Sequence, residues 1–144
     1  MNGAPTRLVL FVCVENIFRS VIAEAIFNAH APSGWHAESA GVTPADSINP
    51  VAVELLEEIG IKVAHGKPRG VTPALIGEAS HVITFGCIDR CPLGAREKCE
   101  DWPIPRSTGR DDLLRPREEL LTIRGEVERR VLKLIHQLQR TGTE

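Results

Sequence analysis

The chain has 144 residues, 42% of them hydrophobic, and a formal net charge of −2 at pH 7. This length and apolar content fit a single domain over residues 1–144, in which 1–6 form a flexible N-terminus. The small negative charge gives no electrostatic support for binding to nucleic acid or to an anionic membrane. No apolar stretch approaches the roughly 20 residues that a helix needs to cross a bilayer.

The N-terminal residues and the cysteines indicate a compartment. Met1 to Arg7 lacks the basic start and the long apolar segment of a signal peptide, so we expect a cytoplasmic protein. Thiols stay reduced in the cytoplasm. The four cysteines of the chain therefore indicate catalysis, redox work or metal binding before structural disulfides.

A strand pattern and a helix pattern flank the first chemical signal. Leu8–Val12 is an unbroken apolar run, which is typical of a parallel strand buried on both faces. From Ser20 onward, apolar residues recur at helical spacing. The N–H groups that open such a helix have no partners within it, and the helix dipole adds positive potential. We therefore expect the segment 13–20 to cradle an anion.

A cysteine and an arginine stand near the two ends of this segment, in the spacing Cys-x5-Arg. Arg19 offers a planar fork of donors that suits the edges of an oxyanion. The same positive field favours the thiolate form of Cys13, which is the form that attacks. The alternative is a small buried cysteine that ends a strand, with Arg19 as a surface charge. The agreement of strand, loop and helix favours the functional interpretation.

Strand and helix patterns alternate along the rest of the chain. We expect a strand over 36–39, a helix from Asn49-Pro50 to Gly60, a short helix opened by Thr72-Pro73, a strand over 81–85 and a long helix from 115 to about 139. The segment 86–110 is expected to be rich in loops. This alternation predicts an α/β fold with a mostly parallel sheet. Ligands of such sheets bind beyond the C-terminal ends of the strands, where Cys13 lies.

Three more cysteines follow the expected strand over 81–85. If that strand lies parallel to Leu8–Val12 in one sheet, Cys13 and Cys87 lie at the same edge. Cys91 comes four residues after Cys87, so the three thiols could pass oxidation outward by thiol–disulfide exchange. Inert thiols are an alternative. A zinc site made by Cys87, Cys91 and Cys99 with a histidine fits less well, because the gaps match no usual zinc spacing.

The segment from Val9 to Ala25 resembles the active-site segment shared by low-molecular-weight protein tyrosine phosphatases and thioredoxin-coupled arsenate reductases. The stretch Ala37-Glu-Ser-Ala-Gly41 resembles a second motif of this superfamily, and 67–69, 82–87 and 101–105 fit it as well. The resemblance covers nearly the whole chain. It implies a single α/β domain with a four-stranded parallel sheet flanked by helices, a low-molecular-weight phosphatase-like, Rossmann-like fold.

The resemblance also implies roles for the residues of the loop. Cys13 would be the nucleophile, Ser20 would hydrogen-bond its thiolate, and Asn16 would brace the loop. The residues implied to bind the oxyanion are Val14, Glu15, Asn16, Ile17, Phe18 and Arg19. Glu15 departs from the family pattern, because a carboxylate that faced a bound dianion would weaken binding by like-charge repulsion. Ile17 and Phe18 make the loop more apolar than is usual in the family.

The other cysteines separate the two branches of the superfamily. The phosphatases use an aspartic acid in an Asp-Pro loop as general acid, and this chain has no Asp-Pro pair and no tyrosine. Cys87 and Cys91 stand where the reductases carry their second and third redox cysteines. The resemblance therefore favours an arsenate reductase, with a part in arsenic detoxification. It implies that Cys13 attacks arsenate, Cys87 attacks the adduct and releases arsenite, Cys91 resolves the Cys13–Cys87 disulfide, and thioredoxin reduces the last disulfide.

Two alternative functions stay open. One is a slow low-molecular-weight tyrosine phosphatase with a Cys13 phosphocysteine intermediate. The other is a catalytically degraded protein of the same fold that binds an oxyanion or senses redox state. Asp101 is the nearest carboxylate to the position of the missing acid, where Arg106 aligns, and it is a secondary candidate for that role.

The sequence predicts no tightly bound cofactor and no metal centre. Asn16, Glu24 and Ser39 could form part of a monovalent-cation site of the kind that some of the reductases carry. We expect His81, at the start of a strand, to be a structural histidine. Trp102 is expected to pack the last helix against the active-site face, and a wall of the substrate cleft is the alternative.

Overall fold

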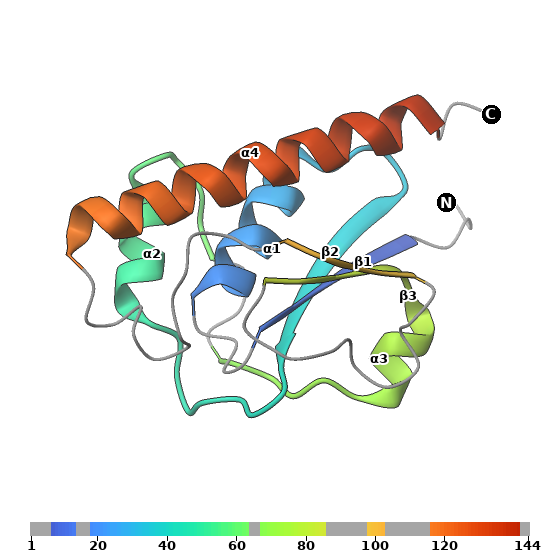
Figure 1. The fold of residues 1–144 in the computed structure, drawn as a ribbon, viewed down its shortest axis with the longest axis horizontal. Helices are drawn as coiled ribbons and strands as arrows, with labels where there is room; N and C mark the ends of the chain where they lie inside the picture. The colour runs from blue at the N-terminus through green and yellow to red at the C-terminus, as the bar shows by residue number, and fades with distance from the viewer. Residues whose placement is uncertain (1–6, 14–17, 64–66, 86–97, 103–115, 142–144) are drawn as a thin grey trace.

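The computed structural model describes residues 7–13, 18–63, 67–85, 98–102 and 116–141. The strands are β1 (Arg7–Cys13), β2 (Trp35–Gly41), β3 (Ala79–Thr84) and β4 (Cys99–Asp101), and the helices are α1 (Arg19–His30), α2 (Pro50–Glu57), α3 (Pro73–Glu78) and α4 (Arg117–Thr141). The strands form one parallel sheet in the order β2-β1-β3-β4 (Figure 1). The predicted α/β fold with a four-stranded parallel sheet is confirmed. Residues 1–6, expected to be flexible, lie outside the described residues.

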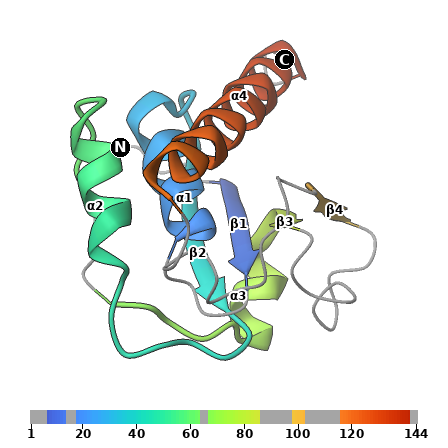
Figure 2. The same cartoon turned by 60° about the vertical axis from the view of Figure 1, so that its left-hand side comes forward.

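β1 is a central strand that is covered on both faces. Val9, Phe11 and Cys13 belong to the larger core cluster, which also contains the apolar faces of α1, α2 and α4. Leu8, Leu10 and Val12 belong to a smaller cluster with Ile76 of α3. Figure 2 shows α1, α2 and α4 on one side of the sheet and α3 on the other. This double coverage explains why the strand is an unbroken apolar run and does not alternate.

Two helices begin at the residues that the sequence predicted as caps. The Asn49 side chain accepts a hydrogen bond from the Val51 amide at 2.9 Å, with Pro50 at the first helical position of α2. The Thr72 hydroxyl accepts one from the Leu75 amide at 3.1 Å at the start of α3. Each side chain satisfies an N–H group that the helix itself leaves without a partner.

The observed boundaries differ from the predicted ones at several ends. α2 ends at Glu57, before the predicted stop, and Gly60 lies in the following turn with φ +80°. α4 extends to Thr141, and β1 includes Cys13 as its last residue. Within the described residues, no helix is both long enough and apolar enough to cross a membrane.

β4 is a strand in a segment that the residue pattern predicted as loop. Its residues Cys99, Glu100 and Asp101 pair with Val82, Ile83 and Thr84 of β3. Three residues of mixed polarity carry no periodicity that identifies a strand. The partner strand therefore creates this element through long-range pairing, which local sequence does not reveal.

Candidate active site

Cys13 ends β1 at the C-terminal edge of the sheet. It is 7% exposed and is a free thiol. Its carbonyl accepts a hydrogen bond from the Val42 amide at 3.1 Å, which fixes the end of β1 to the chain that leaves β2. The Cys13 Sγ lies 2.9 Å from the Oγ of Ser20, and either atom can donate. When the cysteine is a thiolate, the serine O–H is the donor, and this hydrogen bond stabilises the charged form.

Arg19 opens α1 and is 3% exposed. Its Nη1 donates to the carbonyl oxygen of Phe85 at 2.9 Å. Phe85 directly follows β3, which lies beside β1 in the sheet. This contact uses one of the five N–H donors of the guanidinium. It holds the positive charge of Arg19 at the same edge of the sheet as Cys13.

The N-terminus of α1 has the features of an anion site. Phe18 is the N-cap residue, and its side chain cannot hydrogen-bond the first amides of the helix. Those amides carry partial positive charge that a bound anion can use. The Phe18 ring is 1% exposed and belongs to the larger core cluster. The apolar residue at position 18 therefore anchors the loop in the core, which the sequence did not predict.

Several predicted site residues lie outside the described residues. They are Val14, Glu15, Asn16, Ile17, Cys87 and Cys91. The structure brings together Cys13, Ser20, Phe18 and Arg19, which the sequence placed in one segment. The catalytic and binding roles of all these residues stay predictions.

Cys99 is disulfide-bonded. It begins β4 and pairs with Val82 in the sheet. This bond differs from the expectation that the cysteines of the chain would be reduced thiols. The spacing of the cysteines in the sequence carries no signal for this disulfide.

Asp101, the secondary candidate for general acid, ends β4 with an exposed side chain. Its Oδ1 accepts a hydrogen bond from the Thr84 hydroxyl at 2.5 Å. β4 is the second strand from β1, so Asp101 is displaced sideways from Cys13 by about 10 Å at the usual strand spacing. The Asp101 carboxylate thus has a structural contact with Thr84, and its role as general acid stays a prediction.

Glu24 and Ser39, two of the residues proposed for a monovalent cation, are in contact. The Ser39 hydroxyl donates to Glu24 Oε1 at 2.5 Å. Arg69 also reaches this pair, because its Nη2 lies 3.5 Å from Glu24 Oε2. Within the described part of the chain, no group of three or more His, Cys, Asp or Glu residues is arranged to hold a metal ion.

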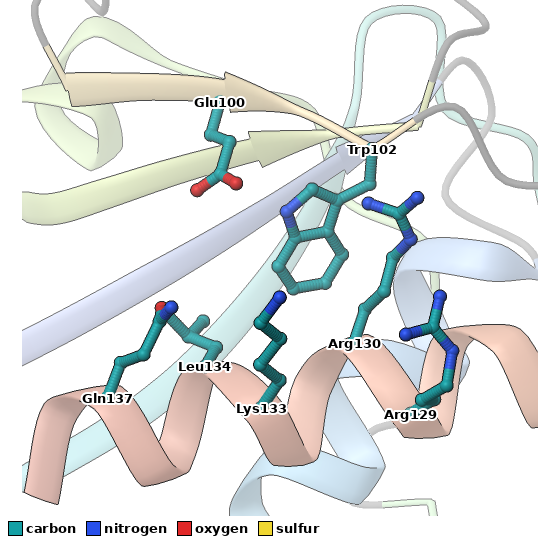
Figure 3. A pocket seen from close by; sticks show the side chains of 7 residues that line it. All are labelled: Glu100, Trp102, Arg129, Arg130, Lys133, Leu134 and Gln137. Atoms are coloured by element: carbon teal, nitrogen blue, oxygen red, sulfur yellow. The ribbon is translucent and has the colours of Figure 1, made fainter.

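Cavities of about 170 Å³ and 510 Å³ lie along α4, next to β4, and neither is lined by Cys13. Figure 3 shows the smaller one, with Lys133 and Arg130 of α4 facing Trp102 and Glu100. Trp102 is 4% exposed, and its ring centroid lies 5.9 Å from that of Phe11. Trp102 therefore packs between the sheet and α4, which confirms the predicted contact with the last helix. We place the candidate active site at Cys13 because of its polar contacts.

Known proteins resemble the chain in sequence and in fold. An arsenate reductase of Bacillus licheniformis is 32% identical over 99 residues, which cover 67% of this chain and 70% of that protein. The structure of a thioredoxin-dependent arsenate reductase of Corynebacterium glutamicum has a TM-score of 0.79 at 31% identity. The match covers 97% of this chain but 65% of that one, so this chain spans less than two thirds of the length of that reductase.

A phosphatase is also among the similar structures. An arginine phosphatase of Geobacillus stearothermophilus has a TM-score of 0.78 at 27% identity, and the match covers 94% of each chain. Reduction and dephosphorylation are both enzyme activities, so these relatives indicate that the chain is an enzyme. A sequence model described as low molecular weight phosphotyrosine protein phosphatase matches residues 8–144. The resemblance seen in the sequence is thus confirmed, and the chain belongs to the low-molecular-weight phosphotyrosine protein phosphatase family.

Proposed function

We propose that this protein is a cytoplasmic arsenate reductase that works through Cys13, Cys87 and Cys91 with thioredoxin as reductant. The observation that carries the proposal is the free Cys13 thiol, 2.9 Å from the Ser20 hydroxyl, at the start of a helix with no side-chain cap. This arrangement suits a thiolate that attacks a bound oxyanion. The similarity to arsenate reductases supports arsenate as that oxyanion.

The first step forms a bond between sulfur and arsenic. Arsenate binds through its oxygens to Arg19 and to the amides of the segment 14–19. The Cys13 thiolate attacks arsenic, and one oxygen leaves as hydroxide and takes up a proton to become water. Asp101 is held by Thr84, so we assign the proton to solvent.

The next steps move electrons from thiols to arsenic. The Cys87 thiolate attacks the Cys13 sulfur, the disulfide forms, and the electron pair of the sulfur–arsenic bond stays with arsenic, which leaves as arsenite. The Cys91 thiolate then attacks Cys87 and releases the Cys13 thiolate. Thioredoxin reduces the resulting Cys87–Cys91 disulfide by the same exchange chemistry. The relay runs on reduced thiols, which is why we propose the cytoplasm as its compartment.

The disulfide of Cys99 should delay the first turnover of this cycle. A thiol that shares a bond with Cys99 cannot act as a nucleophile, so we expect the oxidised protein to show a lag before turnover. Pretreatment with dithiothreitol should remove the lag. Cys99→Ser should turn over without a lag, and its steady rate should equal that of the reduced wild type.

The proposal is tested by arsenate-dependent oxidation of NADPH in the presence of thioredoxin and thioredoxin reductase. Wild type should turn over, and Cys13→Ser and Cys87→Ser should show none. Cys99→Ser is the matched control, since it removes a cysteine that the relay does not use. Absence of turnover in the fully reduced wild type, with a reactive Cys13 thiol, would refute the reductase assignment.

A phosphatase is the second candidate, and the similarity to the arginine phosphatase favours it. It would use Cys13 as its only catalytic cysteine. The Cys13 thiolate would attack the phosphorus of a phosphate ester, the alcohol would leave and take up a proton, and water would hydrolyse the phosphocysteine to phosphate. The lack of an Asp-Pro acid predicts a rate about 10²–10⁴ lower than that of an enzyme with a positioned acid. Hydrolysis of a phosphate ester that survives Cys87→Ser, without any arsenate reduction in wild type, would favour this candidate. If neither activity appears but phosphate still raises the melting temperature, the protein binds an oxyanion without catalysis.

A further inference from the structure

A buried carboxylate lies one helical turn beyond the serine that contacts Cys13. Glu24 is 5% exposed, and it is four residues after Ser20 on α1, so both side chains lie on the same face of the helix. Its Oε1 accepts the Ser39 hydroxyl of β2 at 2.5 Å. A charge that deep in a protein requires a compensating positive group.

Arg69 supplies positive charge at this point. Its Nη2 lies 3.5 Å from Glu24 Oε2, and its Nη1 lies 3.4 Å from Glu38 Oε1. These distances exceed those of ordinary N–H···O hydrogen bonds. The guanidinium therefore acts on the two carboxylates chiefly through its charge.

Hydrogen bonds to β2 fix the position of Arg69. Its Nε donates to the carbonyl oxygen of Ser39 at 3.1 Å. Its own carbonyl accepts the Gly41 amide at 2.8 Å, and the next residue, Gly70, forms a parallel bridge with Gly41. The arginine is thus tied to the end of β2 through its side chain and its backbone.

We propose that Arg69 is a tethered cation at Glu24 and Ser39, and that it makes a bound monovalent ion unnecessary in this protein. Carboxylate, hydroxyl and carbonyl oxygens are the ligands that a hard cation prefers. Here the Glu24 carboxylate faces a guanidinium, and the Ser39 carbonyl accepts its Nε–H. A second positive charge at the same oxygens would be repelled by the first. The residues present therefore do not fit a resident monovalent ion.

The position of Arg69 also connects it to the candidate active site. Glu24 and Ser20 share one face of α1, and Ser20 contacts the Cys13 sulfur. By holding Glu24 against β2, Arg69 fixes α1 relative to the strand beside β1. Arg69 thus helps to position the Ser20 hydroxyl at Cys13, and it does so through α1 without touching the sulfur. The inference holds for a reductase and for a phosphatase alike.

The first test compares melting temperatures in KCl, NaCl and choline chloride at equal ionic strength and at pH 7.5. Wild type should melt within about 1 °C in all three salts, since a tethered charge does not depend on the salt supplied. Arg69→Ala should melt lowest in choline chloride, and KCl should raise its melting temperature by about 3 °C or more, because the vacated oxygens can then bind the ion. Arg69→Lys, which keeps the charge, should be insensitive to the choice of salt.

The matched control is Arg124→Ala. Arg124 also joins a backbone carbonyl and a carboxylate, since its Nη1 donates to Leu55 O at 2.9 Å and to Glu58 Oε1 at 3.1 Å. Its loss should lower the melting temperature equally in every salt. Adding Glu24→Gln to Arg69→Ala should remove the effect of KCl, because the carboxylate is the proposed ligand.

The second test measures alkylation of Cys13 by iodoacetamide in the same salts. Arg69→Ala should react more slowly than wild type in choline chloride, and KCl should restore the rate. A potassium-specific rise in the melting temperature of wild type would overturn the proposal, and so would a folded Arg69→Ala that melts equally in all three salts. Should Arg69→Ala fail to fold in every salt, Arg69→Gln removes the charge with less loss of volume and gives the same two outcomes.

Discussion

Side chains of β1 and α1 lie together at the C-terminal edge of the sheet, and one of them reaches the residue after β3. Cys13 ends β1, Ser20 reaches its sulfur from α1, and Arg19 reaches across to the carbonyl of Phe85 after β3. Ser20 is fully buried, so water does not compete for its hydroxyl. A hydrogen bond from this buried hydroxyl stabilises a thiolate at Cys13, because a hydrogen bond to a charged group in a dry site is stronger than one between neutral groups.

At the residue scale, Ser20→Ala should slow the alkylation of Cys13 by iodoacetamide at pH 7 about tenfold, since a hydrogen bond to a charged group is worth about 1.5 kcal/mol. The measurement is the second-order rate constant, followed by loss of free thiol in fully reduced protein with Cys87, Cys91 and Cys99 replaced by serine. Thr122→Ala is the control, because Thr122 donates to a backbone carbonyl within α4, at an exposed position. Equal rates for Ser20→Ala and Thr122→Ala would mean that Ser20 gives the thiolate no hydrogen bond.

Among the elements, the helices begin in two different ways. α2 and α3 have side-chain caps, whereas α1 begins at Phe18 with no side-chain cap. A cap stabilises a helix but occupies the amides that an anion would use. α1 therefore lacks this contribution to stability, and it is stabilised instead by the burial of nine of its twelve residues, Arg19–Phe27.

The cap of α2 gives a prediction at the element scale. Asn49→Ala should lower the free energy of unfolding by about 1–2 kcal/mol, since it removes the acceptor for the Val51 amide. Asn49→Ser keeps an oxygen acceptor and should lose less than half as much. Urea unfolding followed by Trp fluorescence measures both variants. If the serine and alanine variants were equally unstable, the side chain of Asn49 would contribute through packing and not through capping.

Across the whole molecule, the core and the candidate site share the same central strand. The ring centroid of Phe11 lies 6.2 Å from that of Phe27, 6.1 Å from that of Phe85 and 5.9 Å from that of Trp102. These contacts join β1 to α1, to the end of β3 and to the residue after β4. The geometry of the site therefore depends on the packing of the larger core.

At the end of the sheet away from Cys13, the histidine His81 makes the stability of the fold depend on pH. His81 of β3 is partly buried, and its ring centroid lies 5.7 Å from that of Trp35. Burial lowers the pKa of His81 from its ordinary value of 6.5, and the nearby Glu100 carboxylate opposes this shift. Because the unfolded chain binds the proton more tightly, stability is lost as the pH falls from about 6.5 through the lower pKa of the folded state.

His81→Gln should therefore have a smaller loss of unfolding free energy than wild type between pH 7.5 and pH 5.5. Urea unfolding at a series of pH values, at constant ionic strength, measures the slope. His136→Gln is the control, because it removes a histidine that is exposed on α4. A slope for His81→Gln as steep as that of wild type would show that the titration of His81 does not affect stability.

Local patterns in the sequence determined the elements that build the candidate site. The apolar run Leu8–Val12, the helical spacing after Ser20 and the caps Asn49 and Thr72 all depend on near neighbours in the chain. For that reason they were predicted correctly, apart from helix and strand ends. The Cys-x5-Arg segment was found for the same reason, since strand, loop and helix are continuous there.

Only the tertiary structure decided the contacts between distant segments. β4 exists because β3 pairs with it, and Asp101 became a partner of Thr84 through that pairing. Phe18 turned out to lie in the core. Arg69 lies 45 residues from Glu24 in the chain, yet it supplies positive charge where a cation had been considered. No local periodicity or spacing predicts these long-range contacts, because the packing of the whole sheet and its helices brings the side chains together.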